Sequence, residues 1–275
     1  MNSTGRKPIK ESDRQIDTVA KALCILDCFT VAEPELSLKQ LSEKTGLYKS
    51  RIIRLCGTLV AHGFLIRTPA ATHKLGPKLM ILGKVYERTN PLTAVARPIM
   101  KELSSLTGES TKLFVIEGYK RLCLVREKGP SPLQYAINEG ETQALYAGAG
   151  GKLLLAFAPE AFQREIIRRN REKFTDTTIT DSNALQKELK IIRRQGYAFS
   201  KGELVSEVAG LAAPVYDCDG LVCAALNIAG PKQRFADDRR KQMLTQLIDA
   251  ARQLSLLLGN QGECVRPMAA SQQSP

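Results

Sequence analysis

The 275-residue sequence has no long apolar run and contains only two histidines. No stretch approaches the roughly 18 consecutive apolar residues that a membrane-spanning helix requires, so no membrane partner is expected. The N-terminal residues also lack the apolar core of a signal peptide, which predicts a cytoplasmic protein. Both histidines, His62 and His73, lie in the first third of the chain. The larger remainder therefore lacks the commonest general base, and an enzyme is not predicted.

The cysteines do not have the spacing of a metal site. Seven are scattered along the sequence, and none forms a Cys-x-x-Cys pair. Cys24 and Cys28 stand one helical turn apart, but neither histidine lies at the spacing of a zinc finger. We interpret the cysteines as reduced, buried thiols, and we predict neither a metal nor another cofactor.

The charge balance favours a polyanionic partner. The chain carries 40 lysines and arginines against 28 acidic residues, with a formal net charge of +12 and an isoelectric point near 9.4. Such an excess is typical of proteins that bind nucleic acid or an acidic membrane surface. The excess is densest in residues 1–90, where 15 basic residues stand against 8 acidic ones. Without a lipidation signal or a basic amphipathic helix rich in bulky aromatics, nucleic acid is the favoured partner.

Two short helices joined by a glycine turn are predicted within residues 36–64. Ser37 is a suitable N-cap for the first helix, and Gly46 is placed to end it. In the second helix, apolar residues recur at helical spacing and predict a buried side. That side comprises Ile52, Ile53, Leu55, Leu59 and Val60.

The opposite side of the second helix is basic near its N-terminal end. It carries Lys49, Ser50, Arg51 and Arg54. A helix, a short turn with glycine and a second helix with a basic front is the arrangement that places a recognition helix in the major groove of DNA. The alternative is a plain helical hairpin whose basic side is only solvated.

The segments on either side of this hairpin complete a winged helix. A helix from Arg14 is predicted to support the hairpin through one apolar face. That face comprises Ile16, Val19, Ala20, Leu23, Leu26 and Phe29. After the hairpin, predicted strands at 64–67 and 73–75 flank a turn. Arg67, His73 and Lys74 stand where such a wing could contact phosphate or the minor groove. The alternative is an ordinary β-hairpin with exposed basic residues, which the same sequence also fits.

Composition and periodicity divide the chain into five segments. Residues 1–13 and 260–275 are polar and are expected to be disordered tails. The predicted winged helix-turn-helix domain covers 14–76, a linker helix covers 77–90, and a larger domain covers 91–259. The linker helix is predicted to be amphipathic through Leu79, Ile81, Leu82, Val85 and Tyr86. A helical linker would pass a change of orientation from one domain to the other.

The larger domain alternates predicted helices and strands. Helices are expected at 92–106, 159–171, 183–195 and 235–258. Strands are expected at 111–117, 120–128, 132–138, 197–200, 211–217 and 221–229. Short turns between successive strands indicate a mostly antiparallel sheet, so the fold class is α+β.

A glycine-rich loop at Gly148–Lys152 precedes a predicted helix. It does not match a P-loop, because Leu153 stands where that motif requires Ser or Thr. Its glycine spacing does not match the dinucleotide motif either. What remains is a helix N-terminus whose free amides attract a small anion such as a carboxylate. Two alternatives stay open: a tight turn that packs the helix on the sheet, and an enzyme that binds an anionic substrate at this loop.

Six segments, in order and spacing, carry a family resemblance. They are LSLKQLSEKTGLYKSRIIRLCGTLVAHGFL, HKLGPKL, LTGES, YAGAGGKLLLA, IRRQGYAFSKGE and GLAAPVYDCDGLVCAALNIAGP. Over roughly residues 14–258 the chain strongly resembles the IclR family of bacterial transcription regulators. The resemblance implies a winged-helix DNA-binding domain, a linker helix and a GAF-like domain that binds a small effector. It also implies a homodimer or dimer of dimers on a palindromic double-stranded operator near catabolic genes.

The resemblance also assigns candidate residues to each site. The DNA-binding candidates are Lys49, Ser50, Arg51 and Arg54 on the recognition helix, Tyr48 before it, and Arg67 and Lys74 on the wing. The effector candidates are the amides of Gly150 and Gly151, the Asn227 side chain, the wall at Gly210 and Ala229, and Ser200.

Four departures from the family pattern refine these assignments. Tyr48 stands where the family usually has proline. Ser200 replaces an acidic residue, Gly210 replaces a frequent cysteine, and Asn227-Ile-Ala-Gly-Pro replaces Ser-x-Ser-Gly-Pro. Because polar groups that would clasp a very small acid are shortened or lost, we expect a roomier, less polar pocket. Such a pocket would suit an aromatic or larger organic acid, and the target would be an operon for the catabolism of such a compound.

Overall fold

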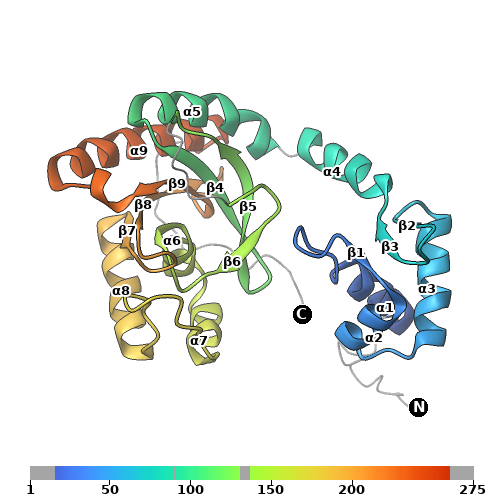
Figure 1. Cartoon of the computed structure of the whole chain (residues 1–275). Coiled ribbons are helices and arrows are strands. Elements are labelled where there is room, and N and C mark those ends of the chain that lie inside the picture. The colour runs from blue at the N-terminus through green and yellow to red at the C-terminus, as the bar shows by residue number, and fades with distance from the viewer. Residues whose placement is uncertain (1–15, 90, 131–136, 261–275) are drawn as a thin grey trace, which may run out of the picture. The chain divides into compact units, whose positions relative to one another are not determined.

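The computed structural model describes residues 16–89, 91–130 and 137–260. The chain divides into two compact units, one ending at Thr89 and the other comprising the described residues from Pro91 onward (Figure 1). The predicted strand at 132–138 lies almost wholly outside the described residues, as do the two predicted tails except for residue 260.

The first unit is a helical domain with a three-stranded antiparallel sheet. Its elements are α1 (Asp17–Leu26), β1 (Glu35–Leu36), α2 (Leu38–Thr45), α3 (Lys49–Ala61), β2 (Leu65–Arg67), β3 (His73–Leu75) and α4 (Pro77–Thr89). The sheet order is β1-β3-β2. The three helices α1, α2 and α3 enclose a core centred on Ile25, Leu41, Ile52 and Leu59. The predicted helix-turn-helix with its wing is therefore confirmed.

The first hairpin helix, α2, begins and ends where its capping residues predict. The Ser37 hydroxyl accepts a hydrogen bond from the Gln40 amide, and the Gln40 side chain accepts one from the Ser37 amide. This capping box satisfies two N–H groups that the first turn leaves free. At the other end Gly46 has φ of +70°, a left-handed conformation that favours glycine and stops the helix.

The predicted buried faces of α1 and α3 are partly wrong. In α1, Ile16, Val19 and Leu23 are exposed, because the helix turns Ile25 toward α3 instead. The helix also begins at Asp17 rather than at Arg14. In α3, Ile53 is 54% exposed while Cys56 takes its place in the core. Helical spacing alone allowed either choice, since all of these residues are apolar.

A short strand that was not predicted holds the wing against the domain. β1 pairs with β3, which places Leu36 opposite His73 and Glu35 opposite Lys74. The Glu35 carboxylate accepts hydrogen bonds from Thr68 and Thr72, on either side of the wing turn. These bonds lower the pKa of Glu35, that from Thr72 most strongly.

The linker helix α4 spans Pro77–Thr89, as its proline and its periodicity predict. Its predicted apolar residues do not form a buried face within this unit. Met80, Ile81, Leu82, Val85 and Tyr86 are all exposed. A single helix with this much exposed apolar surface is unusual, because burial of such side chains is normally what stabilises an amphipathic helix.

The second unit is a six-stranded antiparallel sheet covered by helices. Its helices are α5 (Pro91–Thr107), α6 (Ala149–Phe157), α7 (Glu160–Arg168), α8 (Ser182–Gln195) and α9 (Asp237–Leu257), with a 3₁₀ turn at Lys232–Arg234. Its strands are β4 (Ser110–Glu117), β5 (Lys120–Glu127), β6 (Thr142–Ala144), β7 (Ala198–Lys201), β8 (Val208–Tyr216) and β9 (Val222–Pro231). The sheet order is β6-β5-β4-β9-β8-β7. The predicted α+β class with a mostly antiparallel sheet is confirmed.

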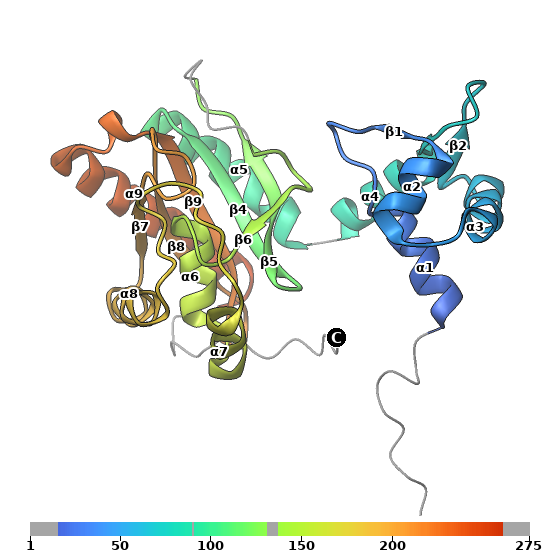
Figure 2. The same cartoon turned by 60° about the horizontal axis from the view of Figure 1, so that its bottom comes forward.

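Helices cover both faces of this sheet (Figures 1 and 2). α5 and α9 pack on one face over a core that includes Met100, Leu226 and Leu247. α6 packs on the other face, with α7 and α8 beyond it, over a second core that includes Phe114 and Leu154. Every residue of α6 is buried, so its N-terminus lies inside the domain rather than at its surface.

Candidate functional sites

The exposed side of α3 carries the predicted basic cluster. Lys49, Ser50, Arg51 and Arg54 are all exposed, while Ile52, Leu55, Cys56 and Leu59 of the same helix are buried. The amphipathic division of the helix therefore turns its basic residues to solvent. Tyr48 is the N-cap residue and is exposed, but its side chain makes no capping hydrogen bond. Its phenol is available to an external partner.

A groove runs along this exposed side beside the start of α1. Thr18, Tyr48, Ser50, Arg51 and Arg54 contribute to its lining. One guanidinium nitrogen of Arg51 lies 3.7 Å from the carboxylate of Asp17, which also binds Lys21 at 2.6 Å. The pKa of Asp17 is lowered, first by the hydrogen bond from Lys21 and to a smaller extent by Arg51. Asp17 thus orients Arg51 without burying it. Ile53 is also exposed, so α3 presents an apolar side chain to solvent besides its basic ones.

The two basic candidates on the wing are exposed, but the third residue of that group is not. Arg67 and Lys74 are exposed, whereas His73 is 5% exposed. Placing His73 at the phosphate-contacting surface was wrong, because its side chain shares the buried face of the sheet with its cross-strand neighbour Leu36. Burial lowers the pKa of His73, and the nearby Arg67 lowers it further. Register pairs His73 with Arg67 and Leu36, so alternation along β3 sends Lys74 to the other face of the wing.

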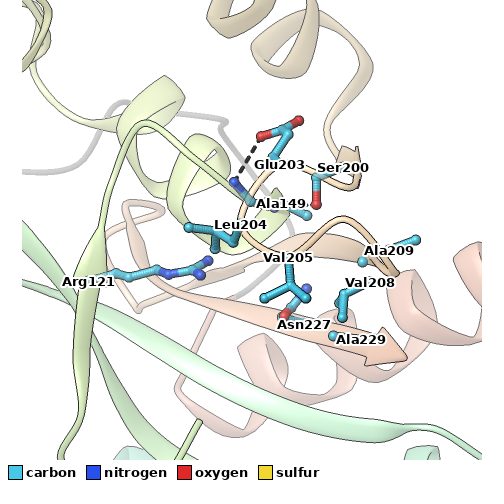
Figure 3. Close-up of a pocket in the computed structure, with 12 residues that line it drawn as sticks. Arg121, Ala149, Ser200, Glu203, Leu204, Val205, Val208, Ala209, Asn227 and Ala229 are labelled. Atoms are coloured by element: carbon cyan, nitrogen blue, oxygen red, sulfur yellow. Dashed lines mark hydrogen bonds between the residues drawn. The ribbon is translucent and has the colours of Figure 1, made fainter. Parts of the chain in front are cut away.

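In the second unit, four predicted effector residues meet at one small cavity. Ser200 comes from β7, Gly210 from β8, and Asn227 and Ala229 from β9. Because these strands are neighbours in the sheet, residues that are far apart in the sequence become adjacent. The rest of the lining consists of Arg121 from β5, the start of α6 at Gly148 and Ala149, and five residues between the ends of β7 and β8, namely Glu203, Leu204, Val205, Val208 and Ala209 (Figure 3).

Gly150 and Gly151 do not line this cavity. A Cβ atom on Gly150 would lie 2.7 Å from the Phe114 ring, and one on Gly151 would lie 2.8 Å from the carbonyl oxygens of Ala144 and Leu145. Both glycines therefore serve close packing of α6 against the sheet and β6. This close packing favours the tight-turn interpretation for the two positions, and the assignment of their amides to the effector stays a prediction.

The amides that face the cavity are those of Gly148 and Ala149, and both are hydrogen-bonded within the chain. The Gly148 amide donates to a carboxylate oxygen of Glu203 at 2.9 Å (Figure 3), and the Ala149 amide donates to the Ser200 hydroxyl at 2.9 Å. The other Glu203 oxygen accepts from the ammonium of Lys152 at 2.6 Å. A carboxylate therefore does sit at the N-terminus of α6, as the helix dipole favours, but it belongs to the protein.

Lys152 and its two acidic partners form a buried network. The Lys152 side chain is only 1% exposed, and its ammonium donates to Glu203, to Glu188 at 2.7 Å, and to the carbonyl of Phe199 at 3.3 Å. Its three N–H groups are thus all engaged. In the sequence Lys152 stands only as the last residue of a glycine-rich loop. Its real partners lie 36 and 51 residues away, on α8 and after β7, where no local pattern points to them.

Two further buried cations lie on the same face of the sheet, and both were missed. Arg121 lines the cavity, places its guanidinium 4.4 Å from the centre of the Phe114 ring, and donates a hydrogen bond to Gln143. Lys112 is fully buried and stands opposite Asn227 in the register of β4 and β9. Burial lowers the pKa of Lys112 to about 7. The inward alternation of strands 110–117 and 120–127 was the one signal that could have identified them.

This cavity has a mostly apolar lining with four polar side chains, those of Arg121, Ser200, Glu203 and Asn227, and it is small. Its volume is about 30 Å³, which leaves room for only about two water-sized groups. The expectation of a roomy pocket is therefore wrong for this conformation. The small residues Gly210 and Ala229 do free space, and the side chains of Leu204 and Val205 enter it from the loop before β8 (Figure 3).

The described residues offer neither a metal site nor a membrane-spanning helix. Within residues 16–89, 91–130 and 137–260, no three His, Cys, Asp or Glu side chains lie together as they would to hold a metal ion. Over the same residues, no helix combines the length and apolar character that crossing a membrane requires.

Comparison with known proteins covers both units. The family model of the IclR helix-turn-helix domain matches residues 18–69, and that of the C-terminal domain of the bacterial transcriptional regulator IclR matches 85–256. The HTH-type transcriptional regulator BhcR of Paracoccus denitrificans is 32% identical over 89% of this chain and 88% of its own length.

Two solved structures are similar over nearly the whole chain. A putative IclR transcriptional regulator from Silicibacter sp. is 28% identical with a TM-score of 0.83, covering 91% of this chain and 100% of that chain. An IclR homologue from Microbacterium hydrocarbonoxydans, solved with 4-hydroxybenzoate, is 25% identical with a TM-score of 0.77, covering 88% of this chain and 99% of that chain.

Proposed function

The chain belongs to the IclR family of bacterial transcription regulators, and on that premise we propose that a small organic acid controls its binding to a palindromic operator. As a regulator of this family it is a DNA-binding protein and not an enzyme. The alternative of an enzyme that uses the loop Gly148–Lys152 is not supported. The amides of that loop that face the cavity already bind Glu203 and Ser200. Its place of action would be the cytoplasm, where the operator is.

The observation that carries this proposal is that a basic helix surface and a small cavity lie in separate units of the chain. One unit exposes a basic helix front on a buried core, and the other holds a small cavity whose lining includes Arg121, Ser200 and Asn227. In the proposed complex, α3 enters the major groove through Lys49, Ser50, Arg51 and Arg54, with Tyr48 at its entrance. Arg67 and Lys74 reach the flanking backbone from the wing. Phosphate contacts hold the protein in register, and the arginines of α3 read base edges.

The effector is proposed to bind at the cavity between the sheet and the N-terminus of α6. Arg121 and the start of α6 supply donors for a carboxylate, and Ser200 and Asn227 add polar side chains. Gly210 and Ala229 form the small-residue wall. The relative solved with 4-hydroxybenzoate shows that this fold takes an aromatic acid in another protein. We extend that class to this chain, together with control of an operon for the catabolism of such a compound.

We further propose that the regulator is a homodimer, or a pair of homodimers. A palindromic operator is read by two copies related by a two-fold axis, so each half-site needs one α3. The exposed apolar residues of α1 and α4, such as Leu23 and Tyr86, are suited to cover one another between copies. Effector binding would then shift the balance between two dimer arrangements, and α4 would carry that shift to α3.

Selection of genomic fragments by the full-length protein tests this proposal directly. Recovered fragments should share a palindromic motif, and footprinting should show protection of two half-sites about one or more helical turns apart. Addition of benzoate, 4-hydroxybenzoate or shorter acids should change the affinity for that motif. Sedimentation velocity should give a dimer or tetramer at the concentrations used. Binding without any sequence preference, or an operator affinity unmoved by every organic acid, would refute the regulatory proposal.

A further inference from the structure

The cavity is too small for an aromatic acid in this conformation. Its volume is about 30 Å³, while pockets for small molecules typically measure about 300–1,000 Å³. An aromatic acid can therefore enter only if some part of the lining leaves.

The carboxylate of Glu203 already occupies the position that the effector's carboxylate would take. It accepts hydrogen bonds from the Gly148 amide at 2.9 Å and from the Lys152 ammonium at 2.6 Å. Both donors are buried, and one is at the positive end of a helix. Charge-assisted hydrogen bonds of this kind are among the stronger ones in proteins. A soluble acid must compete with Glu203 for them.

The next residue, Leu204, separates this cavity from a larger groove. Leu204 lines both the cavity and a neighbouring groove of about 490 Å³. The groove is aromatic: Tyr146 and Phe174 stack with ring centres 6.0 Å apart, and Arg169 lies 3.5 Å from the centre of the Tyr119 ring. Planar aromatic rings pack well against such surfaces. Removal of Leu204 would join an acid-binding end to an aromatic end.

The part of the lining that can leave is the segment from Glu203 to Ser206. Arg121, Ser200 and Asn227 stand on strands of the sheet, and Gly148 begins a buried helix, so none can move without disrupting the core. The segment itself is tied mainly at its ends. The Thr178 hydroxyl donates to the Glu203 carbonyl at 2.7 Å. At the other end, the Lys232 amide donates to the Glu207 carbonyl at 2.8 Å.

We propose that Glu203 and Leu204 form an internal stand-in for the effector, and that the effector is a carboxylic acid with an aromatic ring which displaces both. The acid's carboxylate takes the hydrogen bonds of Glu203, and its ring takes the space of Leu204 and extends toward Tyr146. Lys152 remains paired with Glu188 at 2.7 Å when Glu203 leaves, so the displacement strands no buried cation. This inference rests on the proposed effector role of the same cavity, and it names the ligand class and the residues that set its affinity.

Calorimetry of the full-length protein with benzoate, benzamide and acetate tests this proposal. Glu203→Gln keeps the shape of the side chain but weakens its hold on the donors. It should lower the Kd for benzoate about tenfold. Benzamide, which has no charge, should gain nothing. Glu188→Gln is the matched control, because it also takes one carboxylate from Lys152 but leaves the Gly148 amide occupied. It should leave the Kd for benzoate unimproved.

Leu204→Ala tests the aromatic half of the proposal. It should tighten benzoate binding about tenfold relative to acetate, because only the ring uses the space of Leu204. Equal gains for both acids would show that the groove takes no part. Weaker benzoate binding by Glu203→Gln, an equal gain from Glu188→Gln or with benzamide, or no binding of benzoate by any variant would each overturn the inference.

Hydrogen exchange of the wild-type protein gives an independent readout. The Gly202 amide donates to the Val208 carbonyl at 2.7 Å, and the Val208 amide donates to the Val205 carbonyl at 3.0 Å. Saturating benzoate should raise exchange at these amides while the Gly148 amide stays protected by its new partner. A uniform decrease across the segment would mean that the acid binds without displacing it. If the variants behave as expected but no operator responds to acids, the stand-in is correct and the proposed regulatory function fails.

Discussion

Removal of Lys152 should destabilise the effector-binding unit more strongly than a single surface charge could. Lys152 is 1% exposed and Glu203 is 7% exposed, with 2.6 Å between the ammonium and the carboxylate. Lys152→Met keeps the length of the chain but leaves Glu203 buried with only the Gly148 amide. Breaking a buried ion pair by deleting one partner typically costs about 3–5 kcal/mol, because the remaining charge is uncompensated. We therefore expect a loss of about 4 kcal/mol in the free energy of unfolding.

A double-mutant cycle with Glu203→Gln separates the ion pair from the packing of the methylene groups. Glu203→Gln alone should cost about 2 kcal/mol, since it weakens hydrogen bonds to a charged group. The double variant should also cost about 4 kcal/mol rather than 6, which gives a coupling of about 2 kcal/mol. Urea unfolding followed by circular dichroism measures these values. The transition of the DNA-binding unit is an internal reference, because Lys152 lies outside it.

Lys173→Met is the matched control for this cycle. Lys173 also pairs with a carboxylate, that of Asp176 at 2.8 Å, but both side chains are largely exposed. Exposed pairs contribute little to stability, so this variant should not move the transition measurably. If Lys152→Met cost less than about 1 kcal/mol, or if the two substitutions of the cycle were additive, the buried-network account of Lys152 would be refuted.

Three further variants test the recognition helix, the turn and a buried cation. Arg54→Ala should cost about 1–3 kcal/mol of operator affinity and relax specificity at one base pair. Lys39→Ala on α2 is the control and should do neither. Equal losses of operator affinity by the two variants would contradict base reading by Arg54. Gly46→Ala should destabilise the DNA-binding unit by about 1 kcal/mol in thermal unfolding, because φ is +70° there and a Cβ atom strains that conformation. Gly57→Ala is the control: it should not destabilise the unit, because a Cβ atom in the middle of α3 meets open space. The folded pKa of Lys112, about 7, lies below its unfolded value, so the folded protein binds fewer protons there. The free energy of unfolding should therefore rise above pH 7, and Lys112→Met should flatten that rise. Parallel pH profiles of stability for the wild type and the variant would contradict this assignment.

The helices and strands were largely predictable because local periodicity and end signals specify them. Ser37 and Gly46 bound α2, and Pro77 opens α4, through interactions within a few residues. The errors occurred where the choice depended on distant parts of the chain. The apolar residues of α1 allow two faces, and only packing against α3 selects the one with Ile25. The two-residue strand β1 is too short to show a period, and its pairing partner β3 lies about 38 residues away.

The residues of the candidate sites were likewise predictable where local sequence places them, and not where distant contacts do. Residues on the recognition helix were predictable because one amphipathic helix separates its buried and exposed sides. Ser200, Gly210 and Asn227 were identified through the family pattern, and the sheet does bring them together. Arg121 was missed, and the buried roles of Lys152 and Glu203 were not recognised, because each is isolated in the sequence. Their meaning comes from partners on other elements, and a single charged residue in a sequence does not reveal whether it will be buried.

The size of an effector pocket depends on displaceable side chains as well as on the residues of its wall. Small residues at Gly210 and Ala229 suggested a large pocket, yet the cavity holds about 30 Å³ because Leu204 and Val205 fill the space. Those two side chains stand on a loop, whereas the wall stands on strands. The space beside Gly210 and Ala229 is therefore filled by these loop side chains, and it becomes available only when the loop moves away. In the proposed complex the acid binds only through a change of conformation, and its binding can influence DNA binding only through such a difference between two states.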